Sequence, residues 1–124
     1  MNAWSTEDTV EKKINFIDDE VVFEATCNPT EPAFAPITFK YRPPLGDHKA
    51  AFLDAVAQGI GSTQRAAPQL LRQHLMSWDV KDSRGRDVLI RADTVTKIPP
   101  TMQIAMAMLI IESADQVAEA AKNS

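Results

Sequence analysis

The side chains best suited to catalysis or metal binding are two histidines and one cysteine, and they are scattered along the chain. His48 and His74 fall in different predicted helices, and neither has a carboxylate or a cysteine at the spacing of a zinc motif. A zinc site or a histidine-based catalytic pair would need a convergence in space that the sequence does not indicate. Cys27 has no histidine motif beside it, so we interpret it as a small apolar or surface residue rather than a nucleophile.

The carboxylate clusters and the glycine-containing loop do not match known site motifs either. Residues 18–20 lack the alternating ligands and the turn glycine of a calcium loop. Asp79, Asp82 and Asp87 surround a polar turn, where turn closure and pairing with arginines are their ordinary roles. Residues 59–63 lack the lysine of a P-loop and follow no predicted strand, so they predict a turn between helices. We therefore expect a non-enzymatic protein with no metal and no cofactor.

Length and composition predict one globular domain that needs no disulfide. The chain has 124 residues, 44% of them hydrophobic, and its single cysteine cannot form an intrachain disulfide. The net charge of −4 argues against nucleic acid as the main partner. The longest apolar run, residues 104–111, is too short to cross a membrane, and the N-terminus lacks the features of a signal peptide. We expect a soluble cytoplasmic protein without a nucleic-acid or membrane partner.

The domain organisation follows from where apolar periodicity begins and ends. We predict a flexible acidic arm over residues 1–13, a single α+β domain over residues 14–121 and a flexible end over residues 122–124.

Two strands open the predicted domain. Residues 20–26 are rich in β-branched side chains, and residues 37–42 alternate between an apolar and a polar, partly basic face. Three prolines exclude residues 27–36 from a hydrogen-bonded ladder, so this segment is expected to be a loop. We predict an antiparallel hairpin whose second strand points Ile37, Phe39 and Tyr41 to one side.

Two helices are predicted next. Asp47 is a suitable N-cap for a helix over residues 48–58, and Gly59 is placed to end it because glycine tolerates a positive φ. Its buried stripe is expected to contain Phe52 and Val56.

Ser62 or Thr63 is expected to cap the following helix, which runs to about Met76. Pro68 lies about one turn in, so either the helix kinks there or its regular part starts near that proline. The apolar side continues through Leu71, Leu75 and Trp78.

A second hairpin and a final helix complete the prediction. Residues 78–81 and 87–90 flank a type I turn over residues 82–85, with its glycine in the left-handed region. Asp93 is placed to cap a short helical turn. Two prolines at residues 99–100 then open a helix that runs to about residue 121. The predicted fold class is α+β, with small antiparallel β-hairpin elements and about four helices.

The final helix carries apolar residues on more than one side. A surface helix buries one stripe, so two stripes predict either a fully buried central helix or a side offered to a partner. Flexible methionine side chains suit surfaces that accept varied apolar ligands. Under the second alternative, Trp78 anchors the hairpin beneath the helix. The candidate partner-binding residues on the helix are Met102, Ile104, Met106, Met108 and Ile111.

Several short motifs follow one another in a characteristic order. An aromatic and basic strand, residues 39–43, precedes two helices and the sequence Leu-Met-Ser-Trp-Asp-Val at residues 75–80, which a polar glycine turn follows. Asp-Thr-Val-Thr-Lys-Ile-Pro-Pro at residues 93–100 then leads into the last helix. Over residues 37–109, this order resembles tail assembly chaperones and related small tail proteins of long-tailed bacteriophages.

The resemblance implies a chaperone that binds the long, helical, apolar tape-measure protein before the tail tube polymerises round it, and then leaves. That family has no enzymatic residues. The expected partner is thus the tape-measure protein or another tail protein in the host cytoplasm, and a homo-oligomer is compatible with this role. The alternative is a structural tail or neck component that stays in the virion as a symmetric ring.

Overall fold

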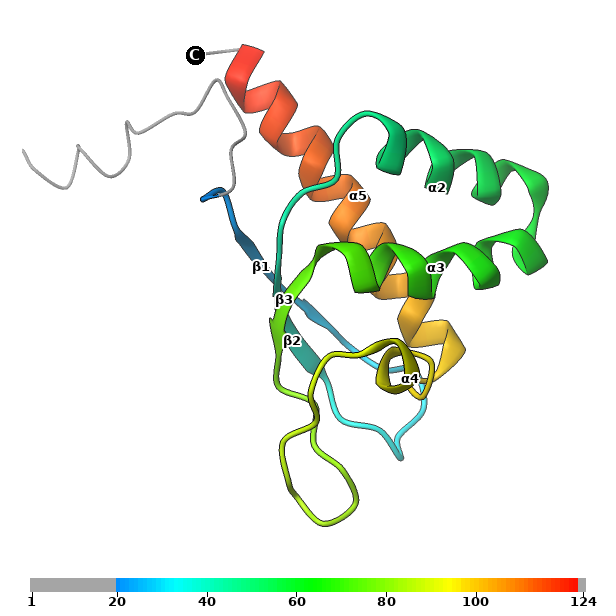
Figure 1. Ribbon diagram of the computed structural model, residues 1–124, viewed down its shortest axis with the longest axis vertical. Helices are drawn as coiled ribbons and strands as arrows, with labels where there is room; N and C mark the ends of the chain where they lie inside the picture. The colour runs from blue at the N-terminus through cyan, green and yellow to red at the C-terminus, as the bar shows by residue number, and fades with distance from the viewer. Residues whose placement is uncertain (1–19, 123–124) are drawn as a thin grey trace, which may run out of the picture.

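A computed structural model of the chain describes residues 20–122, with side chains to residue 112. One three-stranded antiparallel sheet lies against helices on one of its faces, which makes the fold α+β as predicted (Figure 1). The predicted acidic arm, residues 1–13, lies outside the described residues. No described helix is both long and apolar enough to span a membrane.

Strands β1 (Phe23–Cys27) and β2 (Ile37–Tyr41) form the predicted antiparallel hairpin, in a register that pairs Phe23 with Tyr41 and Cys27 with Ile37. The alternation in β2 also holds, because Ile37, Phe39 and Tyr41 are buried while Lys40 is exposed. The hairpin therefore has one face in the core and one polar face towards solvent.

Strand β3 (Leu75–Trp78) pairs antiparallel with the other edge of β2. The sequence placed the first two of these residues at the end of a helix, which is wrong. Helix propensity is a weak prior, and pairing with the second edge of β2 satisfies backbone groups that would otherwise lack partners. Met76 is the extra residue of a bulge, because Lys40 pairs with Ser77 and the next residue, Tyr41, pairs with Leu75.

Helices α2 (Asp47–Gln58) and α3 (Ile60–His74) form a helical hairpin across Gly59, whose φ of 122° confirms the expected positive φ. The predicted caps are wrong. Gly46 and Gly59 occupy the N-cap positions, and neither helix has a side-chain cap. Asp47 instead lies in the first turn of α2, where its charge complements the helix dipole.

The start of α3 also differs from the prediction. The helix begins well before Pro68 and includes it. Thr63 does not cap the helix, because its hydroxyl donates back to the carbonyl of Gly59 at 2.8 Å.

Two polar bonds close the predicted second hairpin, which follows β3. Gly85 donates its amide to the carbonyl of Asp82 at 2.9 Å and has a φ of 78°, as the turn prediction requires. The indole Nε1 of Trp78 donates to the carbonyl of Val88 at 2.6 Å, so Trp78 does anchor the hairpin.

Helix α4 (Ala92–Val95) begins after Arg91, and Asp93 lies in its first turn, so the prediction of Asp93 as the cap is wrong. The side-chain bond at the start of α4 comes from Thr94 instead, whose hydroxyl accepts a hydrogen bond from the amide of Arg91 at 2.8 Å.

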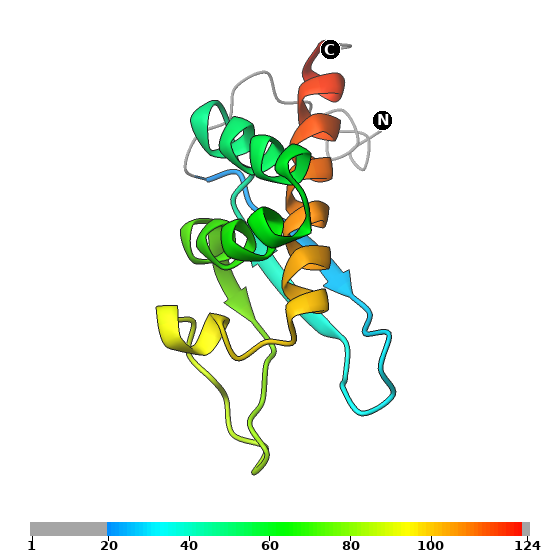
Figure 2. The same ribbon diagram turned by 90° about the vertical axis from the view of Figure 1, so that its right-hand side faces the viewer.

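Helix α5 (Pro100–Lys122) begins where the double proline predicted. It packs against α3 and against β1, and Figure 2 shows it standing beside the sheet. Gln103 is buried in α5, and its amide nitrogen donates to the carbonyl of Ile98 at 2.6 Å. The core gathers apolar side chains from the strands, α3 and α5, with Phe52 from α2 and Val95 from α4.

Two methionines of α5 test this packing. Because Met106 is fully buried, Met106→Ala should lower the free energy of unfolding by about 2–5 kcal/mol. The matched variant Met108→Ala, at a half-buried position, should cost about 1 kcal/mol or less. Urea unfolding followed by circular dichroism measures both, and equal losses would contradict the burial of α5 described above.

Candidate functional site

Most of the residues proposed from the sequence to bind a partner are buried. Met102, Met106 and Ile111 belong to the core and are almost inaccessible to solvent. At these three positions the burial favours the other alternative from the sequence, a central helix packed in the core. The physical reason is that α3 and β1 both pack against α5, and together they cover parts of both apolar stripes.

Ile104 and Met108 remain half-buried. Met108 and Leu109 line a hollow of about 410 Å³ on the side of α5 that faces the end of β1, with Cys27 on the opposite wall. This hollow is the part of the predicted methionine surface that a partner can still reach.

The most exposed apolar face of a described helix belongs to α2 instead. Phe52 is its only buried residue, whereas Leu53 and Val56 are 43% and 38% exposed. The expectation that Val56 belongs to the buried stripe is wrong, because α2 packs on α3 along the side of Phe52. Ala50, Leu53, Val56 and Ala57 recur at the spacing of one helical face, and all four are exposed. We call these four residues the α2 face.

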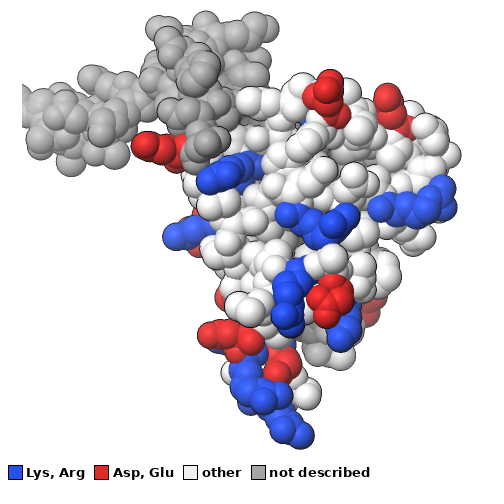
Figure 3. Space-filling view, in the orientation of Figure 1, with Lys and Arg blue, Asp and Glu red and all other residues white. Residues whose placement is uncertain are grey.

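The α2 face lies at the outside of the molecule. Figures 1 and 2 show α2 stacked on α3 at the margin of the fold. Ile60, the first residue of α3, follows directly after the turn and is 67% exposed, so the apolar surface continues past the end of α2. In Figure 3 the charged side chains are densest at the end of the molecule opposite α2, around the second hairpin. An apolar area without a covering element is a common mark of a protein-binding surface.

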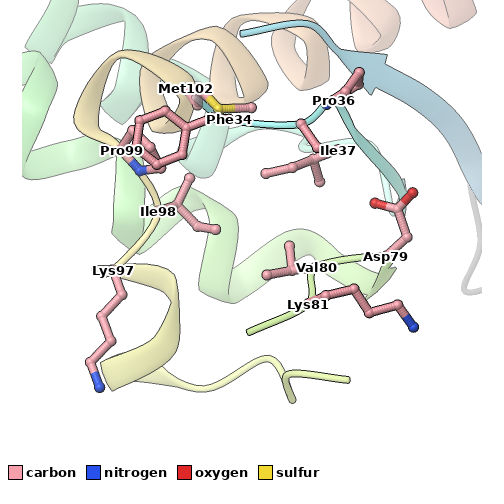
Figure 4. A pocket seen from close by; sticks show the side chains of 11 residues that line it. Phe34, Pro36, Ile37, Asp79, Val80, Lys81, Lys97, Ile98, Pro99 and Met102 are labelled. Carbon is pink, nitrogen blue, oxygen red and sulfur yellow. The ribbon is translucent and has the colours of Figure 1, made fainter. Parts of the chain in front are cut away.

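A second hollow, of about 260 Å³, lies where the loop between β1 and β2 meets the start of α5 (Figure 4). Asp79 lies at its rim, and its Oδ1 already accepts the amide of Thr38 at 2.9 Å. Lys81 and Lys97 lie at its edges and extend away from it (Figure 4). The inner walls are mainly apolar and include Phe34, Ile37, Val80 and Ile98.

The two histidines lie in contact, although no sequence motif predicted it. His48 Nδ1 lies 2.9 Å from His74 Nε2, and the two rings are nearly perpendicular. His48 lies in the first turn of α2 and His74 ends α3, so folding of the helical hairpin brings together residues 26 positions apart. No local spacing rule covers such a pair, so only the tertiary structure reveals it.

The surroundings of His74 determine which nitrogens carry protons. His74 Nδ1 lies 3.0 Å from the carbonyl oxygen of Arg42, which can only accept, so Nδ1 carries a hydrogen. In the neutral pair, His74 Nε2 is then an acceptor and His48 Nδ1 is the donor. Burial lowers the pKa of His74, the nearby His48 lowers it further, and the bond to the Arg42 carbonyl opposes both effects.

The remaining groups considered from the sequence have structural surroundings. Among the side chains of residues 20–112, no three of His, Cys, Asp and Glu lie close enough together to hold a metal ion. Asp82 accepts the amides of Arg84 and Arg86, which hold the pKa of its carboxyl below the usual range. Asp87 pairs with Lys81 rather than with an arginine.

Comparison with known proteins leaves the chain without an assigned family. No protein-family model, no curated protein and no solved structure matches it.

The surroundings of Cys27 generate a testable consequence. The thiol is buried and lies 3.9 Å from the carbonyl oxygen of Met102, and burial raises its pKa. Because the thiolate is the reactive form, Cys27 in the folded protein should react with iodoacetamide at pH 8 at least about tenfold more slowly than in urea. Mass spectrometry of timed samples measures the rate. Equal rates in the two states would contradict the burial of this thiol.

Proposed function

We propose that this protein is a non-enzymatic assembly chaperone that binds an apolar helical segment of a partner protein through the α2 face. The observation that carries the proposal is the exposure of Leu53 and Val56 on a helix whose only buried residue is Phe52. A helix with apolar residues on its outer side as well as its inner side ordinarily packs against something on both.

The spacing on the α2 face fits a helix as the partner. Residues three and four positions apart stand one above the other, and they form ridges between which the side chains of a second helix pack. The two alanines, Ala50 and Ala57, allow close approach, while Leu53 and Val56 project between them. Such contacts are apolar and lack directional hydrogen bonds, so they tolerate many sequences, which suits a chaperone with a long client.

The resemblance in motif order supplies the biological setting of the proposal. In that setting the client is the tape-measure protein of a long-tailed bacteriophage, and binding takes place in the host cytoplasm before the tail tube polymerises. The half-buried Met108 and Leu109 of α5 provide a second apolar contact beside β1.

A structural role in the tail or neck is the second candidate. It is favoured by the presence of two separate apolar surfaces, the α2 face and the hollow at Met108. Different surfaces that join head to tail between identical copies generate a closed ring when the rotation from copy to copy closes on itself. Retention of the protein in purified virions would favour the ring, and its absence would favour the chaperone.

Co-expression with the longest helical protein encoded beside this gene tests the proposal. The wild-type chain should keep that client soluble and elute with it on size-exclusion chromatography with light scattering. The double variant Leu53→Lys and Val56→Lys should abolish the complex, because two charges on the α2 face would have to be desolvated on binding. Its own free energy of unfolding should change by about 1 kcal/mol or less, since both positions are exposed.

The matched control is Leu89→Lys, which adds a charge at an equally apolar position that is 68% exposed and lies outside the α2 face. This variant should bind the client as the wild type does. A client that stays insoluble beside a lone, folded wild-type chain would overturn the proposal. A complex that still forms with both lysines on α2 would show that the client binds outside the α2 face.

A further inference from the structure

The helical hairpin of α2 and α3 is held at its two ends by different means. At the closed end the chain itself turns at Gly59, and the hydroxyl of Thr63 bonds back to that residue. At the open end, the bond between His48 and His74 joins the first turn of α2 to the last residue of α3. Between the two ends, Phe52 is the only buried residue of α2.

Proton counting shows that the histidine bond tolerates one added proton and not two. The neutral pair has one hydrogen between the facing nitrogens, donated by His48 to His74. A first added proton can be accommodated on Nε2 of the exposed His48, because His48 Nδ1 then still donates to His74 Nε2 with one hydrogen between the rings. With both rings charged, each facing nitrogen carries a hydrogen, and two donors at 2.9 Å cannot bond.

We propose that the His48–His74 pair is a pH-sensitive latch: double protonation breaks it and releases α2 from α3. His48 is exposed, so protons reach the pair from solvent. The hollow between the helices, about 200 Å³ in volume, is lined beside His48 by uncharged residues, so no carboxylate there offsets the second charge. Those residues are Ala51, Phe52, Ala66, Gln69, Leu70 and Gln73.

The charged side chains nearest in sequence lie around the latch rather than within it. Asp47 and Lys49 flank His48 on α2, and Arg72 lies two residues before His74 in the last turn of α3. Arg42 approaches from the end of β2, where its backbone carbonyl is the contact with His74. Of these groups, only the Arg42 carbonyl contributes to the shifted pKa of His74, together with burial and His48.

The sign of the pH effect follows from the lowered pKa of His74. The folded chain binds fewer protons at this residue than the unfolded chain, whose histidine has the ordinary value of 6.5. Stability from the neutral pair is therefore fully present above that value and is lost as the pH falls from it through the lower pKa of folded His74. Local release of α2 follows the same rule, because His74 then regains its ordinary affinity for protons.

The latch also controls the α2 face, and this consequence rests on the proposed function. The latched helix presents Leu53 and Val56 on a fixed surface, which limits the ordering cost of binding. Once released, α2 must be ordered again when the partner binds. Affinity for an apolar helix should thus decrease as the pH falls.

Hydrogen exchange of the free protein between pH 7.5 and 5 tests the latch without any partner. After correction for intrinsic exchange, protection of the α2 amides should fall by up to about tenfold per pH unit below the titration of the pair. Protection of the β2 amides, which open with the whole fold, should stay higher than that of the α2 amides throughout this range. Ring nitrogen shifts from NMR should show His74 with its hydrogen on Nδ1 at pH 7.5.

His48→Gln is the matched control, because its amide can donate to neutral His74 or accept from charged His74, and it does not titrate. This exposed substitution should fold at pH 7.5, as checked by circular dichroism, and its α2 protection should vary little with pH. Protection of wild-type α2 that does not depend on pH, or equal pH dependence in His48→Gln, would overturn the latch.

Client binding measured at pH 7.5 and 5.5 separates the latch from the proposed function. Weaker binding of the wild type at pH 5.5, with little change for His48→Gln, supports control of the α2 face by the latch. Equal binding at both pH values, despite loss of α2 protection, overturns that control. Absence of client binding at every pH contradicts the proposed function, while the exchange experiment still decides the latch.

Discussion

Helix α5 carries apolar side chains on two sides, and the fold depends on covering both of them. The sheet approaches through β1 and the helical hairpin approaches through α3, so the methionine-rich helix stands between two packed layers. Met106 and Ile110 are fully buried as a result. With few aromatic residues in the chain, this aliphatic contact supplies much of the apolar burial that stabilises the domain.

The placement of α5 has a consequence for α2. Because α3 uses one side to cover α5, α2 is left to pack on the remaining side of α3, away from the central helix. Phe52 is the single buried side chain of α2, and within the described part of the chain its outer apolar residues Leu53 and Val56 are exposed. The larger exposed apolar side chains of the described helices therefore lie on α2 and at the start of α3 rather than on the methionine-rich α5.

That weak attachment also explains why a pair of histidines can matter. In a helix with many buried side chains, one polar contact would contribute little stability beside the many apolar contacts. In α2 the bond between His48 and His74 stands at the open end of the hairpin, opposite the turn at Gly59. Protonation of this pair acts on a helix with only one buried side chain. A low local stability of this kind is what a local switch requires.

The sequence by itself determined the features that depend on neighbouring residues. Period-two alternation identified β2, the double proline identified the start of α5, and Asp82 with Gly85 identified the turn of the second hairpin. Each of these follows from local steric rules or from burial of one face.

Tertiary structure alone decided which apolar stripes are covered and which distant residues meet. Val56 and Met106 have similar apolar character, yet one is exposed and the other buried, because burial depends on which helix packs where. Leu75 and Met76, predicted to end the second helix, lie in β3 instead, because the second edge of β2 has backbone groups that pair with this strand. His48 and His74 lie far apart in sequence and meet because two helices fold back on each other, a contact that no local pattern encodes.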